Sequence, residues 1–147
     1  MINLIESMLL SHKNALENTF SQKYMAELIR AANLIQNSFL TGNKIVVFGN
    51  GGSAADAQHI AAEFISKLST DRIPLPSIAL TVNSSVITAI ANDYGYDRVF
   101  ARQVQALVSK GDTVIGITTS GKSKNVILGL EAAKERQANT IALTGKL

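Results

Sequence analysis

Two side chains that can handle a proton or hold a metal ion lie one helical turn apart in this sequence. His59 and Glu63 have the spacing i and i+4, which places them on one face of a helix. An imidazole and a carboxylate together suit zinc, and they also suit an acid–base pair. The same spacing equally describes an exposed polar pair, so three interpretations stay open. The other histidine, His12, lies in a predicted amphipathic helix where we expect a solvated position.

A glycine-rich turn comes shortly before this pair. Residues 45–48 are apolar and rich in β-branched side chains, residues 49–52 read Gly-Asn-Gly-Gly, and Ser53 opens an alanine-rich helical pattern. A strand, a glycine turn and a helix N-terminus in this order aim backbone N–H groups at a ligand above the end of the strand. The turn therefore predicts a loop that cradles a phosphate or another polar ligand group, with His59 and Glu63 close to it.

A second candidate loop, residues 118–123, reads Thr-Thr-Ser-Gly-Lys-Ser and holds four hydroxyl side chains around one glycine. It lies between a predicted strand and a predicted helix. Hydroxyls and backbone N–H groups together form a neutral phosphate site with many donors. Capping the following helix requires only one hydroxyl. The composition of this hydroxyl loop therefore favours a phosphate ligand over simple capping.

The same stretch matches the Walker A pattern, because Gly116 is followed at the right distance by Gly121, Lys122 and Ser123. A nucleotide triphosphatase is therefore a rival hypothesis. We expect Gly116 to lie inside the strand, which leaves a loop too short to wrap a phosphate. None of the predicted strands ends in an aspartate that would bind magnesium. Both observations count against the rival.

Asn92 and Asp93 form a third candidate, in a predicted turn before Tyr94 and Gly95. Turn chemistry alone explains an Asn-Asp pair before a glycine. Contacts to a sugar are the functional alternative.

Alternating strands and helices must position these residues. Strands are predicted at 44–48, 77–81, 113–118 and 139–143, and helices at 53–68, 84–92, 97–108 and 125–136. Largely apolar strands that alternate with helices form a parallel sheet covered on both faces. Ligands of such sheets bind at the carboxyl ends of the strands, where the glycine turn and the hydroxyl loop both fall.

Two further amphipathic helices, at 2–18 and 22–40, are predicted before the first strand. Their broad apolar stripes would either cover one face of the sheet or pair with copies of themselves in an oligomer. Both possibilities stay open.

The amino-acid composition limits the classes of protein to which this chain can belong. A chain of 147 residues with 46% hydrophobic and 17% charged residues indicates one folded domain with a real core. No apolar run is long enough to cross a membrane, and acidic Glu6 stands where a signal peptide would be basic. The absence of cysteine fits a cytoplasmic protein. The net charge of +3 comes from scattered residues, so we expect no nucleic-acid partner.

Taken in order, these motifs closely resemble the phosphoheptose isomerases of the sugar isomerase (SIS) domain superfamily. The resemblance rests on residues 49–59, 63, 91–95, 100–104 and 118–126 and extends over nearly the whole chain. It implies a flavodoxin-like parallel sheet and a homotetramer with active sites between subunits. Residues 1–147 would form a single SIS domain, with an oligomerisation segment at 1–40 and the α/β sheet at 41–147.

The resemblance also implies roles for individual residues. The sugar would contact Asn50, Gly51, Gly52, Ser53, Asn92 and Asp93, and the phosphate would contact Thr118, Thr119, Ser120 and Ser123. The first hydroxyl of this loop is usually a serine in the family, and Thr118 keeps the donor. His59 and Glu63 would bind one zinc ion per subunit in members that use zinc. Glu63 would also be the catalytic base, and these two roles compete because a carboxylate bound to a metal is a weaker base.

The activity implied is an aldose–ketose isomerisation through an enediol, from sedoheptulose 7-phosphate to D-glycero-D-manno-heptose 7-phosphate. It would serve the core of bacterial lipopolysaccharide or a related heptose pathway. Two alternatives remain: a non-catalytic SIS protein that binds a replication initiator, and a module that senses a sugar phosphate.

The resemblance also implies a further strand and a C-terminal helix beyond the given residues. In the family this helix supplies a Gln and a His that complete the metal site and provide the partner acid–base group. We expect the segment to exist, because residues 144–146 match the start of the family's next loop.

Overall fold

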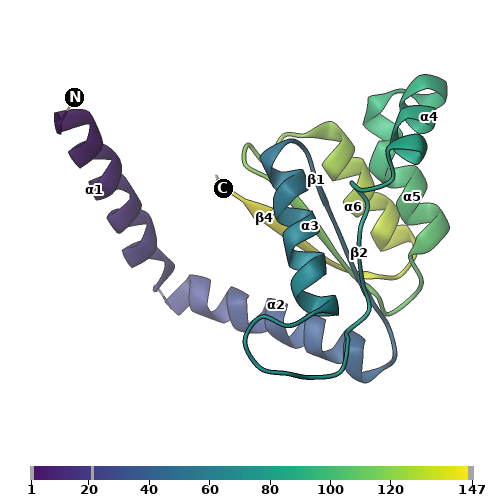
Figure 1. Cartoon of the computed structure of the whole chain (residues 1–147), viewed down its shortest axis with the longest axis horizontal. Coiled ribbons are helices and arrows are strands. Elements are labelled where there is room, and N and C mark those ends of the chain that lie inside the picture. Colours follow the sequence, from purple (N-terminus) through teal and green to yellow (C-terminus); the bar gives the residue numbers. More distant parts are fainter. Residues whose placement is uncertain (1, 21, 146–147) are drawn as a thin grey trace. The chain divides into compact units, whose positions relative to one another are not determined.

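The computed structural model describes residues 2–20 and 22–145, and it divides into two compact units. The first unit extends to Leu34 and holds helix α1 (Ile2–Thr19) with most of helix α2 (Gln22–Leu40). The second unit begins at Ile35 and contains the sheet (Figure 1). Of the loop start predicted at 144–146, the last residue lies outside the described residues.

The second unit is built on a parallel sheet with the strand order β2-β1-β3-β4. Its strands are β1 (Ile45–Gly49), β2 (Ser77–Ala79), β3 (Thr113–Thr118) and β4 (Asn139–Thr144). This is the doubly wound, flavodoxin-like order, so the fold predicted from the sequence is confirmed. Strands β1 and β3 are buried along their whole length, which explains why both are apolar runs.

Helices follow the strands in the predicted alternation. They are α3 (Gly52–Ile65), α4 (Ser84–Tyr94), the short 3₁₀ helix η1 (Tyr96–Arg98), α5 (Val99–Leu107) and α6 (Lys124–Glu135). Strand β2 ends at Ala79 instead of residue 81, helix α3 ends at Ile65 instead of residue 68, and the region after residue 84 differs in two ways. The helix predicted at 97–108 is divided into η1 and α5. Helix α4 also continues to Tyr94, so Asn92 and Asp93 lie in a helix and not in a turn. The chain reverses only at Gly95, whose φ of +84° favours glycine.

Two hydrophobic clusters hold the helices on opposite faces of the sheet (Figure 1). On one face, strand residues such as Phe48 pack with α5 and α6, and the ring of Phe48 stacks on that of Phe100 with their centroids 4.8 Å apart. On the other face, α3 packs on the sheet together with Ile35 and Phe39 from the end of α2. Because helices cover both faces of the sheet, a ligand can reach it only at its edges, as predicted from the sequence.

The first unit presents much apolar surface. Helix α1 has no buried residue, and its exposed apolar side chains are Ile2, Leu4, Ile5, Met8, Leu9, Leu10 and Leu16. Within the described ranges, no helix combines the length and the apolarity needed to span a membrane.

Candidate functional site at the carboxyl edge of the sheet

The glycine turn and the hydroxyl loop are neighbours, because β1 and β3 are adjacent strands and end together. The register pairs Gly49 at the end of β1 with Ile117, one residue before the end of β3. Both loops lie at the edge predicted from the sequence, and the strand order brings them side by side.

Gly49 is required because the start of α3 lies directly over it. A Cβ atom there would come within 2.7 Å of the Ser53 Cβ and 2.9 Å of the Ile117 carbonyl oxygen. Gly51 then turns the chain with a φ of +57°, and α3 begins at Gly52 without a hydrogen bond from a side-chain cap. The N-terminus of this 14-residue helix is therefore left for a ligand to approach.

The hydroxyl loop keeps its shape through its own side chains. The Thr118 hydroxyl is buried and donates to the Ser123 hydroxyl at 2.9 Å, while the Lys122 amide donates to the Ser120 hydroxyl at 3.2 Å. Ser123 occupies the N-cap position of α6, yet its side chain makes no cap hydrogen bond. Thr119 and Ser120 are exposed. Helix capping therefore does not account for the hydroxyl of Ser123.

Gly116 lies inside β3, as expected, where it pairs with Phe48. A Cβ atom at this position would meet side-chain atoms of Leu130 and Val126 at 3.0 Å. The glycine therefore serves the packing of α6 on the sheet. Only residues 119–123 remain for a loop, which is too short for the Walker A geometry and argues against a nucleotide triphosphatase.

His59 and Glu63 lie on one face of α3, with 3.9 Å between the His59 Nε2 and the Glu63 Oε1. The His59 side chain is 74% exposed, whereas Glu63 is 32% exposed. The Glu63 Oε2 atom is buried and has no hydrogen-bond partner. Leaving such an acceptor unpaired is costly, and native structures usually satisfy it with a partner, a water or an ion. The interpretation as an exposed polar pair therefore does not explain the buried, unpaired oxygen of Glu63.

The donor chemistry of this pair fits part of a zinc site. One imidazole and one carboxylate with an unpaired oxygen are suitable zinc ligands. Over residues 2–20 and 22–145, no group of three His, Cys, Asp or Glu side chains is placed to hold a metal ion. Any zinc site here would need further ligands, from elsewhere in the chain or from another subunit.

Asn92 and Asp93 are exposed near the end of α4, and their side chains bond to each other, with Asn92 Nδ2 donating to Asp93 Oδ1 at 2.8 Å. The structure therefore does not itself bring this pair into the glycine turn.

Asn125 and Tyr96 join the site although the sequence analysis assigned them no role. The amides of Asn50 and Asn125 exchange two hydrogen bonds, each 2.9 Å long. The Tyr96 hydroxyl donates to the Asn50 Oδ1 at 3.0 Å. We call Asn50, Asn125 and Tyr96 the amide clasp. Their sequence signal was weak, since an Asn early in a helix and a Tyr after a glycine are both common.

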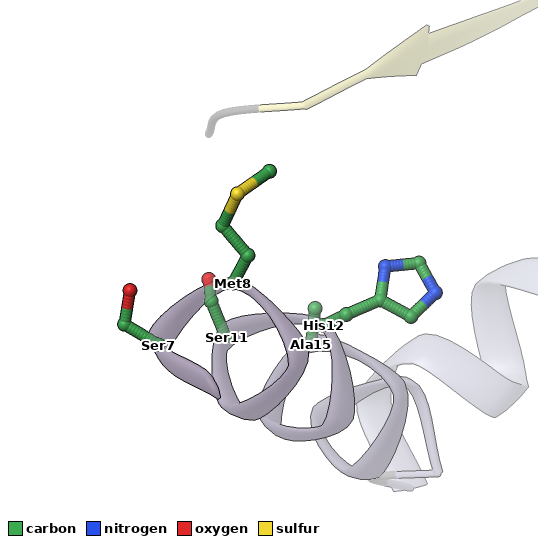
Figure 2. A pocket seen from close by; sticks show the side chains of 5 residues that line it. All are labelled: Ser7, Met8, Ser11, His12 and Ala15. Atoms are coloured by element: carbon green, nitrogen blue, oxygen red, sulfur yellow. The ribbon is translucent and has the colours of Figure 1, made fainter. Parts of the chain in front are cut away.

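A separate hollow lies on α1 and is lined by Ser7, Met8, Ser11, His12 and Ala15 (Figure 2). All five residues come from this single helix, and their side chains project outward from it. The His12 position is exposed, as predicted. No other element lines the hollow, and none of the lining residues besides His12 can carry a charge, so the hollow is not a candidate site.

The fold and this edge define a member of the SIS domain family, whose model matches residues 10–145. The chain belongs to this family. It is 52% identical over 127 residues to "Phosphoheptose isomerase" of Aquifex aeolicus, and 57% identical over 120 residues to "Probable phosphoheptose isomerase" of Thermoplasma acidophilum. These matches cover 86% and 82% of this chain. The sequence resemblance to phosphoheptose isomerases is thereby confirmed.

A solved structure gives the same answer for the fold. A phosphoheptose isomerase from Francisella tularensis superposes with a TM-score of 0.92 at 36% identity, covering 97% of this chain and 74% of that one. This chain spans only 66% of the length of the Aquifex and Thermoplasma relatives.

Proposed function

We propose that the protein is a phosphoheptose isomerase that converts sedoheptulose 7-phosphate into D-glycero-D-manno-heptose 7-phosphate. The observation that carries the proposal is the buried, unpartnered Oε2 of Glu63 on the helix that begins at the glycine turn. A carboxylate with a free oxygen is suited to accept a proton. The relatives named phosphoheptose isomerase support the substrate.

The hydroxyl loop would bind the phosphate of the substrate. Thr119, Ser120 and Ser123 would supply neutral donors. The Thr118 hydroxyl donates to Ser123 here and would turn to the phosphate when it binds, and α6 begins directly after the loop at Lys124. The partial positive charge at a helix N-terminus favours an anion. Because β1 and β3 are adjacent, a phosphate held here would let the sugar extend toward the glycine turn, where Asn50, Gly51, Gly52 and Ser53 would contact its hydroxyls.

Proton transfer would then involve Glu63. The base removes a proton from C1 of the ketose while the oxygen on C2 gains a proton, which gives the enediol. A proton is then delivered to C2 and the hydroxyl proton on C1 departs, so that C1 becomes the aldehyde carbon. Glu63 can carry the proton between the two carbons. The partner acid–base group would come from outside the described residues. Asn92 and Asp93 would contact the sugar in a site shared between subunits.

Zinc is part of the proposal, with His59 and Glu63 as two of its ligands. When bound, zinc would polarise the carbonyl oxygen of the sugar as a Lewis acid. A Glu63 carboxylate engaged in this way would be a weaker base, so the metal and base roles of Glu63 compete.

The remaining parts of the proposal concern context. Homologous enzymes support a role in heptose metabolism, and we propose the lipopolysaccharide core as the destination of the product. A homotetramer built through α1 and α2 would cover the exposed apolar side chains of α1. The cysteine-free composition supports a cytoplasmic location.

A direct assay tests the proposal. The protein, expressed from its complete gene, is incubated with sedoheptulose 7-phosphate, with and without a chelator, and the product is followed by NMR. We expect turnover that the chelator reduces and added zinc restores. Absence of turnover in both conditions, from a well-folded protein, would reject the isomerase. Binding of the sugar phosphate without turnover would instead indicate the sensor.

A further inference from the structure

We propose that Asn125 is a positioning residue that fixes the distance between the hydroxyl loop and the glycine turn. The inference deepens the proposed function and rests on it. Asn125 would touch neither the phosphate nor the sugar. It would act through Asn50, and so set where the sugar chain lies relative to the base Glu63.

The hydrogen bonds of the amide clasp carry this inference. Each amide of the Asn50–Asn125 pair donates to the other, at 2.9 Å in both directions. Asn50 Oδ1 also accepts from the Tyr96 hydroxyl at 3.0 Å. An amide oxygen has two lone pairs, and both are used here. Asn50 therefore retains a single N–H for a ligand, and the turn offers the sugar mainly its backbone, which the clasp holds in place.

The clasp is anchored on rigid elements. Asn125 is only 4% exposed and lies in the first turn of α6, two residues after Ser123. The end of the hydroxyl loop and the partner of Asn50 are therefore parts of the same helix. On the opposite side, η1 carries Tyr96 and is tied to the same end of α6, because Asp97 pairs with the Lys124 Nζ at 2.7 Å. Three segments distant in sequence are thus joined at one point of the carboxyl edge.

A fixed gap matters because proton transfer is sensitive to distance. The base must lie within hydrogen-bond distance of the proton that it removes from carbon. If the substrate is displaced by about 1 Å from this position, the rate can fall by about two orders of magnitude. With the phosphate held at one end of a seven-carbon chain, the gap between the loops decides which carbon faces Glu63. Loss of the clasp should therefore lower kcat while leaving the affinity for phosphate itself unchanged.

A double-mutant cycle tests the inference. The variants are Asn125→Ala, Asn50→Ala and the two combined, assayed for kcat and KM with sedoheptulose 7-phosphate and for binding of inorganic phosphate by calorimetry. We expect Asn125→Ala to lower kcat about tenfold or more and to change phosphate affinity less than about twofold. Because Asn125 acts through Asn50, its removal should have little further effect in the Asn50→Ala background.

Two further variants guard against a loss of folding. Tyr96→Phe removes one hydrogen bond from a side chain that is 56% exposed, so the protein should fold normally and kcat should fall by a few fold. Lys134→Gln changes an exposed lysine in the last turn of the same helix as Asn125, away from the clasp, and should leave kcat within about twofold.

The outcomes separate this inference from the proposed function. Three results would overturn the positioning role. They are reductions in kcat that add in the double variant, an unchanged kcat in Asn125→Ala, or a loss of phosphate affinity in Asn125→Ala as large as its loss of kcat. If the wild-type protein shows no turnover, the isomerase proposal fails, and calorimetry with sedoheptulose 7-phosphate decides the inference. Asn125→Ala must then weaken binding of the sugar phosphate and not that of inorganic phosphate, and any other pattern overturns it.

Discussion

At the residue scale, the edge of the sheet depends on groups that are exceptional for what they lack. Gly49 lacks a side chain where α3 crosses the end of β1. Glu63 lacks a partner for one buried oxygen. Ser123 lacks the capping bond that its position would normally provide. Gly49 and Ser123 leave space or unused hydrogen-bonding capacity at the two loops, and Glu63 leaves an unused acceptor further along α3.

Two of the three glycines of the turn, Gly49 and Gly52, give a matched test of the space at Gly49. Gly49→Ala should destabilise the protein by about 1–3 kcal/mol, because the new methyl group would meet backbone atoms that have no room to move. Gly52→Ala is the control, since a Cβ atom there has nothing within 4 Å. Urea denaturation followed by circular dichroism measures both. Equal stabilities for the two variants would show that α3 does not sit over Gly49 as described.

Glu63 shows where sequence reasoning ends at this scale. The spacing of His59 and Glu63 alone favoured an exposed pair, and their position after the glycine turn kept a metal pair and an acid–base pair open. The unpartnered oxygen became visible only when the burial of each atom was known. The amide clasp escaped sequence reasoning for the same reason, since residues 75 positions apart, such as Asn50 and Asn125, meet only through the strand order.

At the element scale, the alternation of apolar strands and helices predicted the fold well. The strand at 113–118 and the helix at 22–40 have the predicted bounds. The misjudged region was 84–108. Asn, Asp and Gly at 92–95 are typical of a turn, but only Gly95 breaks the helix, because α4 keeps its hydrogen bonds up to the Gly95 amide, which donates to Ala91. Turn propensity is a local preference that a helix can override.

The loop between β3 and α6 can be tested as an anion site. Ser123→Ala should weaken binding of inorganic phosphate roughly threefold to tenfold, since one hydroxyl hydrogen bond is worth about 1 kcal/mol. Thr41→Ala, before β1 at the opposite edge, is a suitable control because its hydroxyl bonds to carbonyl oxygens near the end of α2 and to the Asn43 amide, all of them away from the hydroxyl loop. Calorimetric titration with inorganic phosphate measures the affinity of both variants. A loss of affinity in the control alone would place the phosphate elsewhere.

At the scale of the whole molecule, α1 carries a row of exposed apolar side chains. Ile2, Leu9 and Leu16 recur every seven residues and are each more than half exposed. A seven-residue apolar repeat is typical of helices that pack side by side. The sequence had left open whether the first two helices cover the sheet or pair with copies. The structure shows that the end of α2, at Ile35 and Phe39, joins the core of the second unit, and α1 has no buried residue.

The proposed homotetramer can be tested through this surface. Leu9→Glu should lower the mass measured by light scattering, because a carboxylate cannot be buried in an apolar interface without a partner. Lys13→Gln changes an exposed polar residue of the same helix and should leave the mass at four chains. A wild-type protein that remains a monomer at high concentration would reject the tetramer.

The central claim is that Glu63 moves a proton between C1 and C2 of the sugar phosphate, and isotope exchange tests it most directly. Sedoheptulose 7-phosphate is incubated in D₂O with the wild-type protein and with Glu63→Gln, and deuterium in the substrate and product is located by NMR. We expect the wild-type protein to incorporate deuterium at C1 or C2. The variant should bind the sugar phosphate but leave both carbons unlabelled. Turnover without deuterium, or labelling by Glu63→Gln at the wild-type rate, would contradict the account.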